Sequence, residues 1–293
     1  MQQARQQFGG DWTAEKLERV RKYLVAYATI MKDYRFRYAY IDAFAGTGYR
    51  TLRKDDDTNE LMFPEFAESS SVQFLDGSAR IALQVRPKFE SYIFIEQDRT
   101  RFQALEQLRV DFPEVQTRIK LVNADANTYL QNLCFNKVWK DHRAVLFLDP
   151  FGMQVQWRTI EAIAQTKAID LWILFPLGVA INRLLRRDGN INETWRNRLD
   201  TMFGTTDWFE AFYQPKVQPT LFGDEVTLEK TGDFSAIAQY FVKRLKTVFA
   251  GVAGNPLPLY NSRNNPLYLL CFASGNPKGS KTAIKIANDI LKR

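Results

Sequence analysis

The stretch YAYIDAFAGTGYR, residues 38–50, decides the fold that this sequence predicts. It begins as an apolar run typical of a buried strand and reaches an acidic residue at Asp42. Gly46 and Gly48 follow, and a Gly-x-Gly turn lets the backbone approach a ligand closely because no Cβ is in the way. The stretch therefore predicts a strand that brings a carboxylate and a glycine turn to a binding site.

Short apolar runs alternate with helical patterns along the rest of the chain, which is typical of a parallel sheet with helices on both faces. The first helix is expected over residues 11–32, where Lys16 interrupts an ideal capping box. Near the C-terminus, residues 256–275 read as an antiparallel hairpin about an Asn-rich turn. We therefore expect one α/β domain over residues 1–293 with a mostly parallel, seven-stranded sheet. Insertions are expected at 49–77 and, on the substrate side, at 189–234.

Composition excludes several classes of protein. His142 is the only histidine, so a multi-histidine metal site is impossible, and we expect this residue in a surface loop. Cys134 and Cys271 stand in apolar contexts, which indicates buried free thiols and fits a reducing cytoplasm. No apolar run approaches the roughly 18 residues of a membrane span, and no signal peptide is expected. The formal net charge of +7 permits binding to a nucleic acid.

Four successive predicted strands end in acidic residues: Asp42, Glu96, Asp125 and Asp149. Each could simply cap the helix that follows it. In an open α/β sheet, however, ligands bind beyond the carboxyl ends of the strands. Four acids at these ends, beside the glycine turn, indicate a shared ligand.

A nicotinamide dinucleotide is one alternative. That site needs G-x-G-x-x-G followed by an acidic residue about 20 positions later. Thr51 occupies the position of the third glycine, and Glu96 matches the spacing only if residues 49–77 are an insertion. Spacing leaves this alternative open, although it gives the later DPFG sequence, residues 149–152, no role.

The same four strand ends resemble the motifs of class I S-adenosylmethionine-dependent methyltransferases, which have a Rossmann-like fold. DAFAGTG, FIEQD, NADA and LFLDPFG resemble their first four motifs in order. The resemblance implies that S-adenosylmethionine is the cofactor. It implies that Glu96 binds the ribose hydroxyls and that Asp125 binds the adenine amino group. The cofactor-binding residues implied in this way are Asp42, Phe44, Gly46, Gly48, Glu96, Asp125 and Ala126.

The DPFG sequence resembles the D/N-P-P-Y/F motif of amino-methyltransferases, with phenylalanine in the third position and glycine in the fourth. The tRNA guanine-N2 methyltransferases also show DPFG. The resemblance implies that Asp149 and a backbone carbonyl accept hydrogen bonds from the target amine, while Phe151 stacks on the base. Asp149, Pro150 and Phe151 are therefore the candidate catalytic residues, and the alternative is a strand-terminating Asp-Pro turn.

A resemblance over nearly the whole chain is to the three-Cys-motif partner (TcmP) family of bacterial, methyltransferase-like proteins. It is carried by FGGDWTAEKLERVRKYLVAY, YIDAFAGTGYR, DGSARIAL, YIFIEQD, LFLDPFG and NPLYLLCFASGNPKG. The family's name implies a partner with a three-cysteine motif, of the type seen in radical S-adenosylmethionine proteins.

Two functions follow from these expectations. The first is methyl transfer from S-adenosylmethionine to an exocyclic amine of a base in RNA or DNA. The second is a cofactor-binding subunit that serves the three-cysteine protein without methylating. Arg183, Arg186 and Arg187, after the strand LWILFP, are candidate phosphate contacts, and we expect Arg183 and Arg187 to share one helix face. The lysines of the last helix are a second candidate group, and for both groups the alternative is a solvated face without a ligand.

Overall fold

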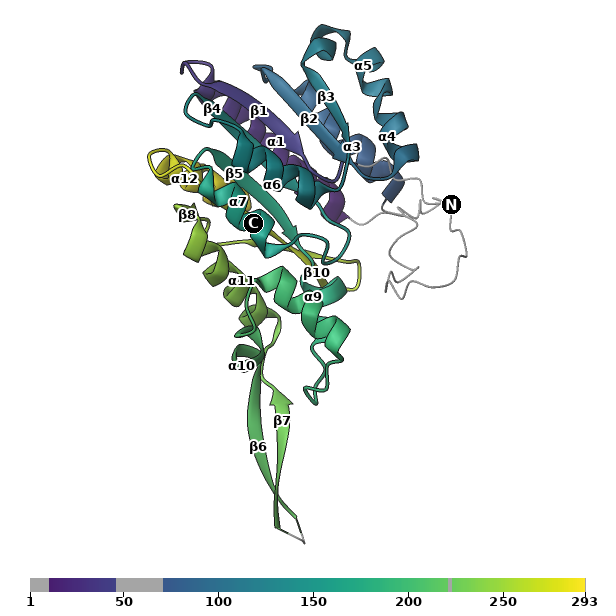
Figure 1. Ribbon diagram of the computed structural model, residues 1–293, viewed down its shortest axis with the longest axis vertical. Helices are drawn as coiled ribbons and strands as arrows, with labels where there is room; N and C mark the ends of the chain where they lie inside the picture. Colours follow the sequence, from purple (N-terminus) through teal and green to yellow (C-terminus); the bar gives the residue numbers. More distant parts are fainter. Residues whose placement is uncertain (1–10, 46–70, 221–222, 293) are drawn as a thin grey trace, which may run out of the picture. The chain divides into compact units, whose positions relative to one another are not determined.

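Four parallel strands form a sheet in the described residues of the first of two structural units. The computed structural model describes residues 11–45, 71–220 and 223–292. The first unit comprises Met1–Tyr129 and Asp141–Phe147. Its strand order is β3 (Ile119–Asn123), β2 (Ser91–Glu96), β1 (Arg37–Asp42) and β4 (His142–Leu148) (Figure 1). The order 3-2-1-4 returns the chain past β1, as expected for an open α/β sheet.

The described residues of this unit form helices α1 (Asp11–Met31), α3 (Ser71–Gln84), α4 (Arg99–Leu105) and α5 (Gln107–Asp111), followed by the short helix η1 (Pro113–Arg118). Helix α6 (Ala126–Asn136) begins here and continues into the second unit. The helix expected over residues 11–32 is confirmed because apolar residues recur every three or four positions and are buried: Leu17, Val20, Leu24 and Ala28.

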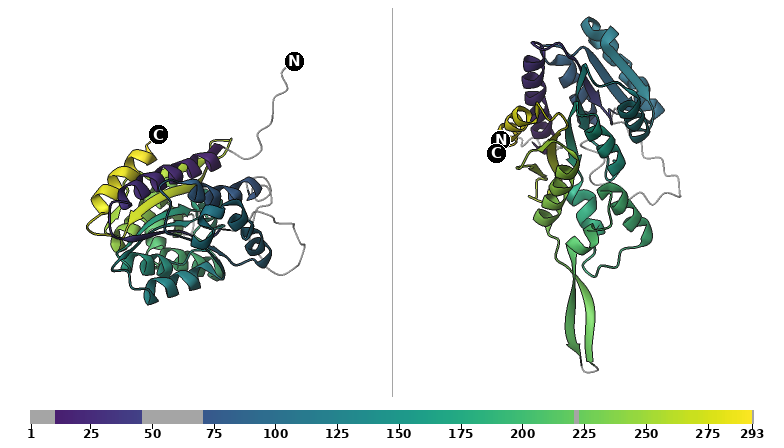
Figure 2. Two further views of the ribbon diagram at one scale, coloured as in Figure 1. Left: turned by 90° about the horizontal axis from the view of Figure 1, so that it is seen from above. Right: turned by 60° about the vertical axis from the view of Figure 1, so that its left-hand side comes forward.

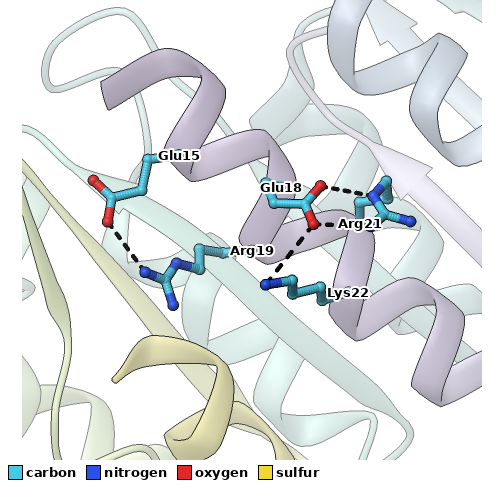
Figure 3. A network of polar contacts seen from close by, with 5 residues as sticks. All are labelled: Glu15, Glu18, Arg19, Arg21 and Lys22. Carbon is cyan, nitrogen blue, oxygen red and sulfur yellow. Dashed lines mark hydrogen bonds and ion pairs between the residues drawn. The ribbon is translucent and has the colours of Figure 1, made fainter. Parts of the chain in front are cut away.

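The opposite face of α1 carries paired charges (Figure 3). Arg19 lies 3.2 Å from Glu15, and Arg21 lies 2.7 Å from Glu18. Lys22 is 3.8 Å from the same Glu18 carboxylate. Such pairs three or four residues apart each stabilise a helix by about 0.2–0.5 kcal/mol. The paired charges thus mark the solvent face, while the apolar residues set the buried face.

Aromatic packing forms the core beneath α1. The Phe89 ring lies 5.4 Å from Tyr38, 6.2 Å from Tyr40 and 5.8 Å from Tyr92, all edge-on. Tyr27 of α1 stacks on Phe89 at 6.1 Å. Tyr38, Tyr40 and the next alternate residue of β1 therefore face α1, because side chains alternate between the two faces along a strand.

The second unit comprises Leu130–Lys140 and Leu148–Arg293. Strand β10 (Pro266–Ser274) lies antiparallel to β5 (Ile169–Phe175), to β8 (Gly251–Val252) and to β9 (Leu257–Tyr260). Helix α12 (Ser280–Leu291) packs on one face, where a Cβ at Gly251 would meet Ile284. On the other face, Phe241 of α11 (Phe234–Val248) stacks on Phe175 at 4.0 Å, beside α7 (Trp157–Gln165) (Figure 2).

The expected fold class is confirmed. The chain is a mixed α/β protein with a mostly parallel sheet, and β9 with β10 form the antiparallel hairpin expected over residues 256–275. Apart from the separate two-stranded sheet, the described residues form eight strands rather than the seven expected, because β8, β9 and β10 all occur in the C-terminal region. None of the helices in the described ranges is long and apolar enough to cross a membrane.

The segment expected as an insertion at 189–234 contains α9 (Glu193–Phe203) and α10 (Trp208–Phe212). A two-stranded antiparallel ribbon follows, formed by β6 (Tyr213–Thr220) and β7 (Gly223–Lys230). In Figures 1 and 2 this ribbon extends away from α9, α10 and α11 of the same unit. The other expected insertion, 49–77, lies outside the described residues up to residue 70, and its last seven residues belong to α3.

Two local expectations are wrong. His142 is the half-buried first residue of β4, where it pairs with Arg37, rather than part of a surface loop. Arg183 and Arg187 do not share a helix, because the π-helix η2 (Leu177–Ile181) leads into α8 (Asn182–Leu184), which ends there. The Tyr213 hydroxyl and the Lys230 backbone N–H instead donate to the carbonyls of Arg186 and Arg187, which holds this segment in a turn.

Candidate functional site

Asp42 ends β1 as a fully buried carboxylate. Its Oδ2 accepts a hydrogen bond of 3.3 Å from the Tyr40 hydroxyl, two residues earlier on the same face. Asp42 is in register with Phe94 of β2 and Phe147 of β4. Strand β1 therefore lies between two other strands of the sheet. The Asp42 carboxylate lies at the carboxyl end of β1, and ligands bind beyond the carboxyl ends of the strands in such folds.

The chain after Asp42 continues along β2 toward Glu96. The Ala43 N–H donates to the Phe147 carbonyl at 3.1 Å, and the Ala45 N–H donates to the Ile95 carbonyl at 2.9 Å. Phe44, between them, is half-buried. These bonds bring Ala45, the residue before Gly46, beside the end of β2. Gly46 and Gly48 themselves lie outside the described residues.

Glu96 ends β2 with only 8% of its surface exposed. Because Asp42 is in register with Phe94, Glu96 lies two residues further along and on the same side of the sheet. Its Oε1 accepts a 2.8 Å hydrogen bond from the Asp98 N–H, and Arg101 is 3.9 Å away. Burial raises the pKa of Glu96, and the Asp98 N–H and Arg101 lower it by less. A buried carboxylate of this kind suits a ligand that donates hydrogen bonds to it.

Asp125 follows β3 and caps α6. Its Oδ1 accepts from the N–H and from the hydroxyl of Thr128, both at 2.8 Å. The capping alternative is therefore confirmed for this residue. The bonds described use one carboxylate oxygen, so capping leaves Oδ2 able to accept from a ligand. Ala126, the first residue of α6, is buried.

Backbone and side-chain hydrogen bonds fix the ends of β2 and β3 together. Asn123 is in register with Glu96, and its amide Nδ2 donates to the carbonyls of Glu96 and Gln97 at 2.8 and 2.9 Å. The Ala124 N–H donates to the same Glu96 carbonyl at 3.2 Å. The structure thus brings Asp42, Glu96 and Asp125 to the ends of three adjacent strands, as the sequence predicts.

Lys16 is a candidate site residue that the sequence analysis did not identify. It is fully buried on α1, with Nζ 5.5 Å from the centroid of the Phe147 ring and 5.6 Å from that of Trp12. Asp42 and Phe147 are in register and share the α1 side of the sheet, so the ammonium and the Asp42 carboxylate lie on the same side. The sequence does contain one indication of this burial: Lys16 lies four residues before Val20, in the apolar stripe of the helix.

The DPFG sequence lies in the second unit, directly after β4. Pro150 is buried, Asp149 is half-buried and the Phe151 ring is 38% exposed. The Phe151 N–H donates to Gln154 Oε1 at 3.0 Å, and Gly152 has a φ of +65°, a conformation that favours glycine. The turn therefore presents an aromatic ring to solvent beside a carboxylate, an arrangement that could stack on a planar acceptor.

Tyr268 is a second residue that the sequence analysis did not assign. It lies on β10 one residue before Leu269, which pairs with Phe175 at the end of β5. Burial raises the pKa of the Tyr268 phenol, and the Asp149 carboxylate raises it further. The Tyr268 phenol therefore holds its proton more tightly than an exposed tyrosine does, and it lies within electrostatic reach of Asp149. No local pattern distinguishes it, because its role depends on the pairing of β10 with β5.

The candidate phosphate-binding arginines and a surface pocket lie in the second unit. Arg183, Arg186 and Arg187 are all exposed, and Arg186 lies 3.4 Å from Asp188. A surface pocket of about 390 Å³ lies between α7 and α11 near Lys167, at the amino end of β5. That is the end opposite Tyr268, so this pocket is separate from the DPFG turn.

Acidic, histidine and cysteine side chains are described over most of the chain. Within residues 11–45, 71–220 and 223–292, no three His, Cys, Asp or Glu side chains gather as a metal site. Cys134 and Cys271 are buried free thiols, as predicted, and burial raises their pKa.

Comparisons with known proteins find no matching family model and no significant match among curated proteins. Solved structures with a similar chain path include the spermidine synthase of Thermotoga maritima (10% identity, TM-score 0.38, 97% of this chain and 72% of that one). The methyltransferase domain of a bacterial Hen1 protein gives 10% identity and a TM-score of 0.37 over 87% of this chain and 99% of that one. A predicted S-adenosylmethionine-dependent methyltransferase from Listeria monocytogenes gives 9% identity and a TM-score of 0.37, covering 88% and 98%. Sequence identities and TM-scores this low do not assign a function, so the function has to be argued from the residues of the site.

Proposed function

We propose that this protein is an S-adenosylmethionine-dependent methyltransferase. The observation that supports the proposal is the set of three acids, Asp42, Glu96 and Asp125, at the ends of adjacent parallel strands, with Ala45, the residue before Gly46, hydrogen-bonded beside β2. Ligand sites in open α/β sheets form at this edge.

The described residues fit such a cofactor in their chemistry. Glu96 is a buried acceptor suited to the two hydroxyls of a ribose, and Asp125 keeps one oxygen for an amino group. Lys16 supplies a cation in the same unit, which suits the carboxylate of a methionine moiety. When bound, the cofactor supplies an electrophilic methyl group on a positively charged sulfonium.

We propose an exocyclic amine of a nucleic-acid base as the acceptor. Asp149 would accept a hydrogen bond from the amine and so orient its lone pair, while the exposed Phe151 ring would stack on the base. Pro150 is buried and holds the turn. Tyr268, a protonated donor near Asp149, would orient that carboxylate.

The second candidate is a cofactor-binding subunit of the TcmP type that serves a three-cysteine radical S-adenosylmethionine-type protein without methylating. Its support is Phe151 at the position where amino-methyltransferases usually carry a second proline. Both candidates share the cofactor site and differ only in whether methyl transfer occurs.

Calorimetric titration tests the shared part of the proposal. S-adenosylmethionine and its demethylated product should bind to the purified protein, and NAD should not. NAD binding in preference to S-adenosylmethionine would support the dinucleotide alternative and refute the proposal. Incubation with a labelled methyl donor and total RNA, DNA or protein then separates the candidates, since incorporated label supports the enzyme and its absence supports the subunit.

A further inference from the structure

Beyond its base, where Gly189 lies against Leu228 and Tyr213, the ribbon formed by β6 and β7 has two exposed faces. The cross-strand pairs Pro215–Leu228 and Val217–Val226 lie on one face, and the intervening pair Lys216–Thr227 lies on the other. Val217 is 57% exposed and Val226 is 65% exposed. A two-stranded ribbon is marginally stable by itself in water, so an apolar face of this kind is typical of a surface that packs against something else.

The two edges of the ribbon differ in their ability to pair with a further strand. Pro215 and Pro219 have no N–H, and in antiparallel pairing a proline is tolerated where the N–H would point away from the partner strand. These prolines therefore remove donors from the outer edge of β6. Such prolines commonly protect an edge against pairing.

Strand β7 has no proline, so its outer edge keeps its donors. Leu228 lies opposite Pro215, Val226 opposite Val217 and Asp224 opposite Pro219. Since N–H groups alternate between the two sides of an antiparallel strand, the N–H groups of these three residues of β7 point away from β6. Lys230, two residues beyond Leu228, demonstrates this geometry because its N–H donates to the Arg187 carbonyl at 3.1 Å. The segment at Arg187 thus already occupies the base of this edge.

The charge of the open edge selects its partner. Glu225 and Glu229 lie on the polar face of β7 and Asp224 on the other, and all three are exposed. Lys216 pairs with Glu229 at 3.0 Å across the ribbon, which leaves the acidic character concentrated at Asp224 and Glu225. Antiparallel pairing of two copies of β7 about Thr227 would place Glu225 opposite Glu229, which disfavours a second copy of the chain in that register. Carboxylates also repel a phosphate backbone, which disfavours a nucleic acid.

We propose that the outer edge of β7, Asp224–Leu228, binds an extended basic segment of a protein partner by β-strand addition. The backbone groups of Val226 and Leu228 pair with the added strand. Apolar side chains of that strand cover Val226, beyond the point where Gly189 already lies against Leu228, and its lysine or arginine side chains meet Glu225. This interaction is independent of methyl transfer.

The probe is a fluorescein-labelled peptide of alternating lysine and valine, about as long as β7 and blocked at both ends, titrated against the full-length protein by fluorescence anisotropy. Val226→Pro removes one outward donor, and we expect it to weaken binding about tenfold. Val217→Pro is the matched control. Val217 lies opposite Val226 on β6, whose outer edge already lacks donors at Pro215 and Pro219, so this change should leave the affinity for the peptide unchanged. Hydrogen exchange should show protection of the 226 and 228 amides on binding.

Charge reversal provides a second variant that keeps the backbone intact. Asp224→Lys with Glu225→Lys should weaken the lysine–valine peptide about fivefold at low salt and allow a glutamate–valine peptide to bind. Equal loss in both proline variants, or no loss in either, would overturn the proposal. Concentration-dependent dimerisation abolished by Val226→Pro would assign the edge to a second copy instead, and competition by an RNA oligonucleotide would assign it to nucleic acid.

Discussion

The Glu96 carboxylate is buried at the end of β2, and this burial governs its titration. Because burial raises its pKa above that of the unfolded chain, the folded protein holds this proton more tightly than the unfolded chain does. Burying the charged form therefore destabilises the fold above the folded-state pKa, and this cost is lost as the pH falls through that pKa. A carboxylate kept in such a position at a cost to stability is typical of a binding site.

We expect Glu96→Gln to raise the free energy of unfolding near neutral pH, and this gain to shrink as the pH is lowered through the raised pKa of Glu96. Glutamine keeps an oxygen for the Asp98 N–H and carries no charge. Urea denaturation across the acidic range measures the difference, with the exposed Glu106→Gln as control. A gain that grew at lower pH would contradict the burial argument. The same variant should bind S-adenosylmethionine more weakly at neutral pH.

Asp149 gives the second residue-scale prediction. Asp149→Ala should lower methyl transfer about a hundredfold or more, because the amine loses its acceptor, while cofactor affinity changes by a few fold at most. Asp149→Asn, which keeps an acceptor oxygen, should retain part of the activity. The measurements are label incorporation and calorimetry on the same preparations. Loss of cofactor affinity in a folded Asp149→Ala protein would make this residue a cofactor ligand instead.

At the scale of elements, the chain leaves β5 through an unusual helix that packs closely on β10. Helix η2 has π geometry, which is rare, occurs mostly as single turns and is frequent at functional sites. A Cβ at Gly178 would overlap the Pro266 carbonyl oxygen, so the backbone of η2 contacts the start of β10 directly. This contact positions the end of β10 that carries Tyr268.

Gly178→Ala should therefore destabilise the fold by about 1–3 kcal/mol, the usual cost of inserting a methyl group into a packed site. Gly254→Ala is the matched control, because a Cβ there would meet no atom within 4 Å. Thermal and urea unfolding measure both variants. Equal stability of the two would show that η2 can move away from β10 without cost.

At the scale of the whole molecule, the net charge of +7 is the feature that a nucleic-acid substrate would use. Two exposed basic groups are candidates in the second unit: the three arginines after η2, and the lysines at the start of α12. Each group can be neutralised by three alanine substitutions, so the two variants remove equal charge.

We expect RNA binding to weaken as salt rises, with a log–log slope of about 0.7 per phosphate contact for a single strand and about 0.9 for duplex DNA. Changing Arg183, Arg186 and Arg187 to Ala together should flatten this slope by about two units and leave S-adenosylmethionine binding intact. The control triple changes Lys278, Lys281 and Lys285 to Ala and should flatten it less. Filter binding over a salt series measures both, and a slope near zero for the wild-type protein would exclude a polyanionic substrate.

Local pattern was sufficient to predict much of this protein. The strands up to Phe175 and the hairpin of β9 and β10 follow from runs of apolar residues between turn residues, which act over a few positions. Asp42, Glu96 and Asp125 reach one edge of the sheet because parallel strands place their carboxyl ends together. These three positions could therefore be predicted before any tertiary contact was known.

Tertiary structure alone decided the rest. Burial of Lys16 against Phe147 depends on α1 packing over the sheet, and the approach of Tyr268 to Asp149 depends on β10 pairing with β5 across about a hundred residues of chain. The expected helix through Arg187 ends early because side-chain and backbone donors of the ribbon capture its carbonyls. Each of these outcomes depends on partners far away in the sequence, so the residues that bond to one another cannot be read from the local pattern that predicts strands and helices.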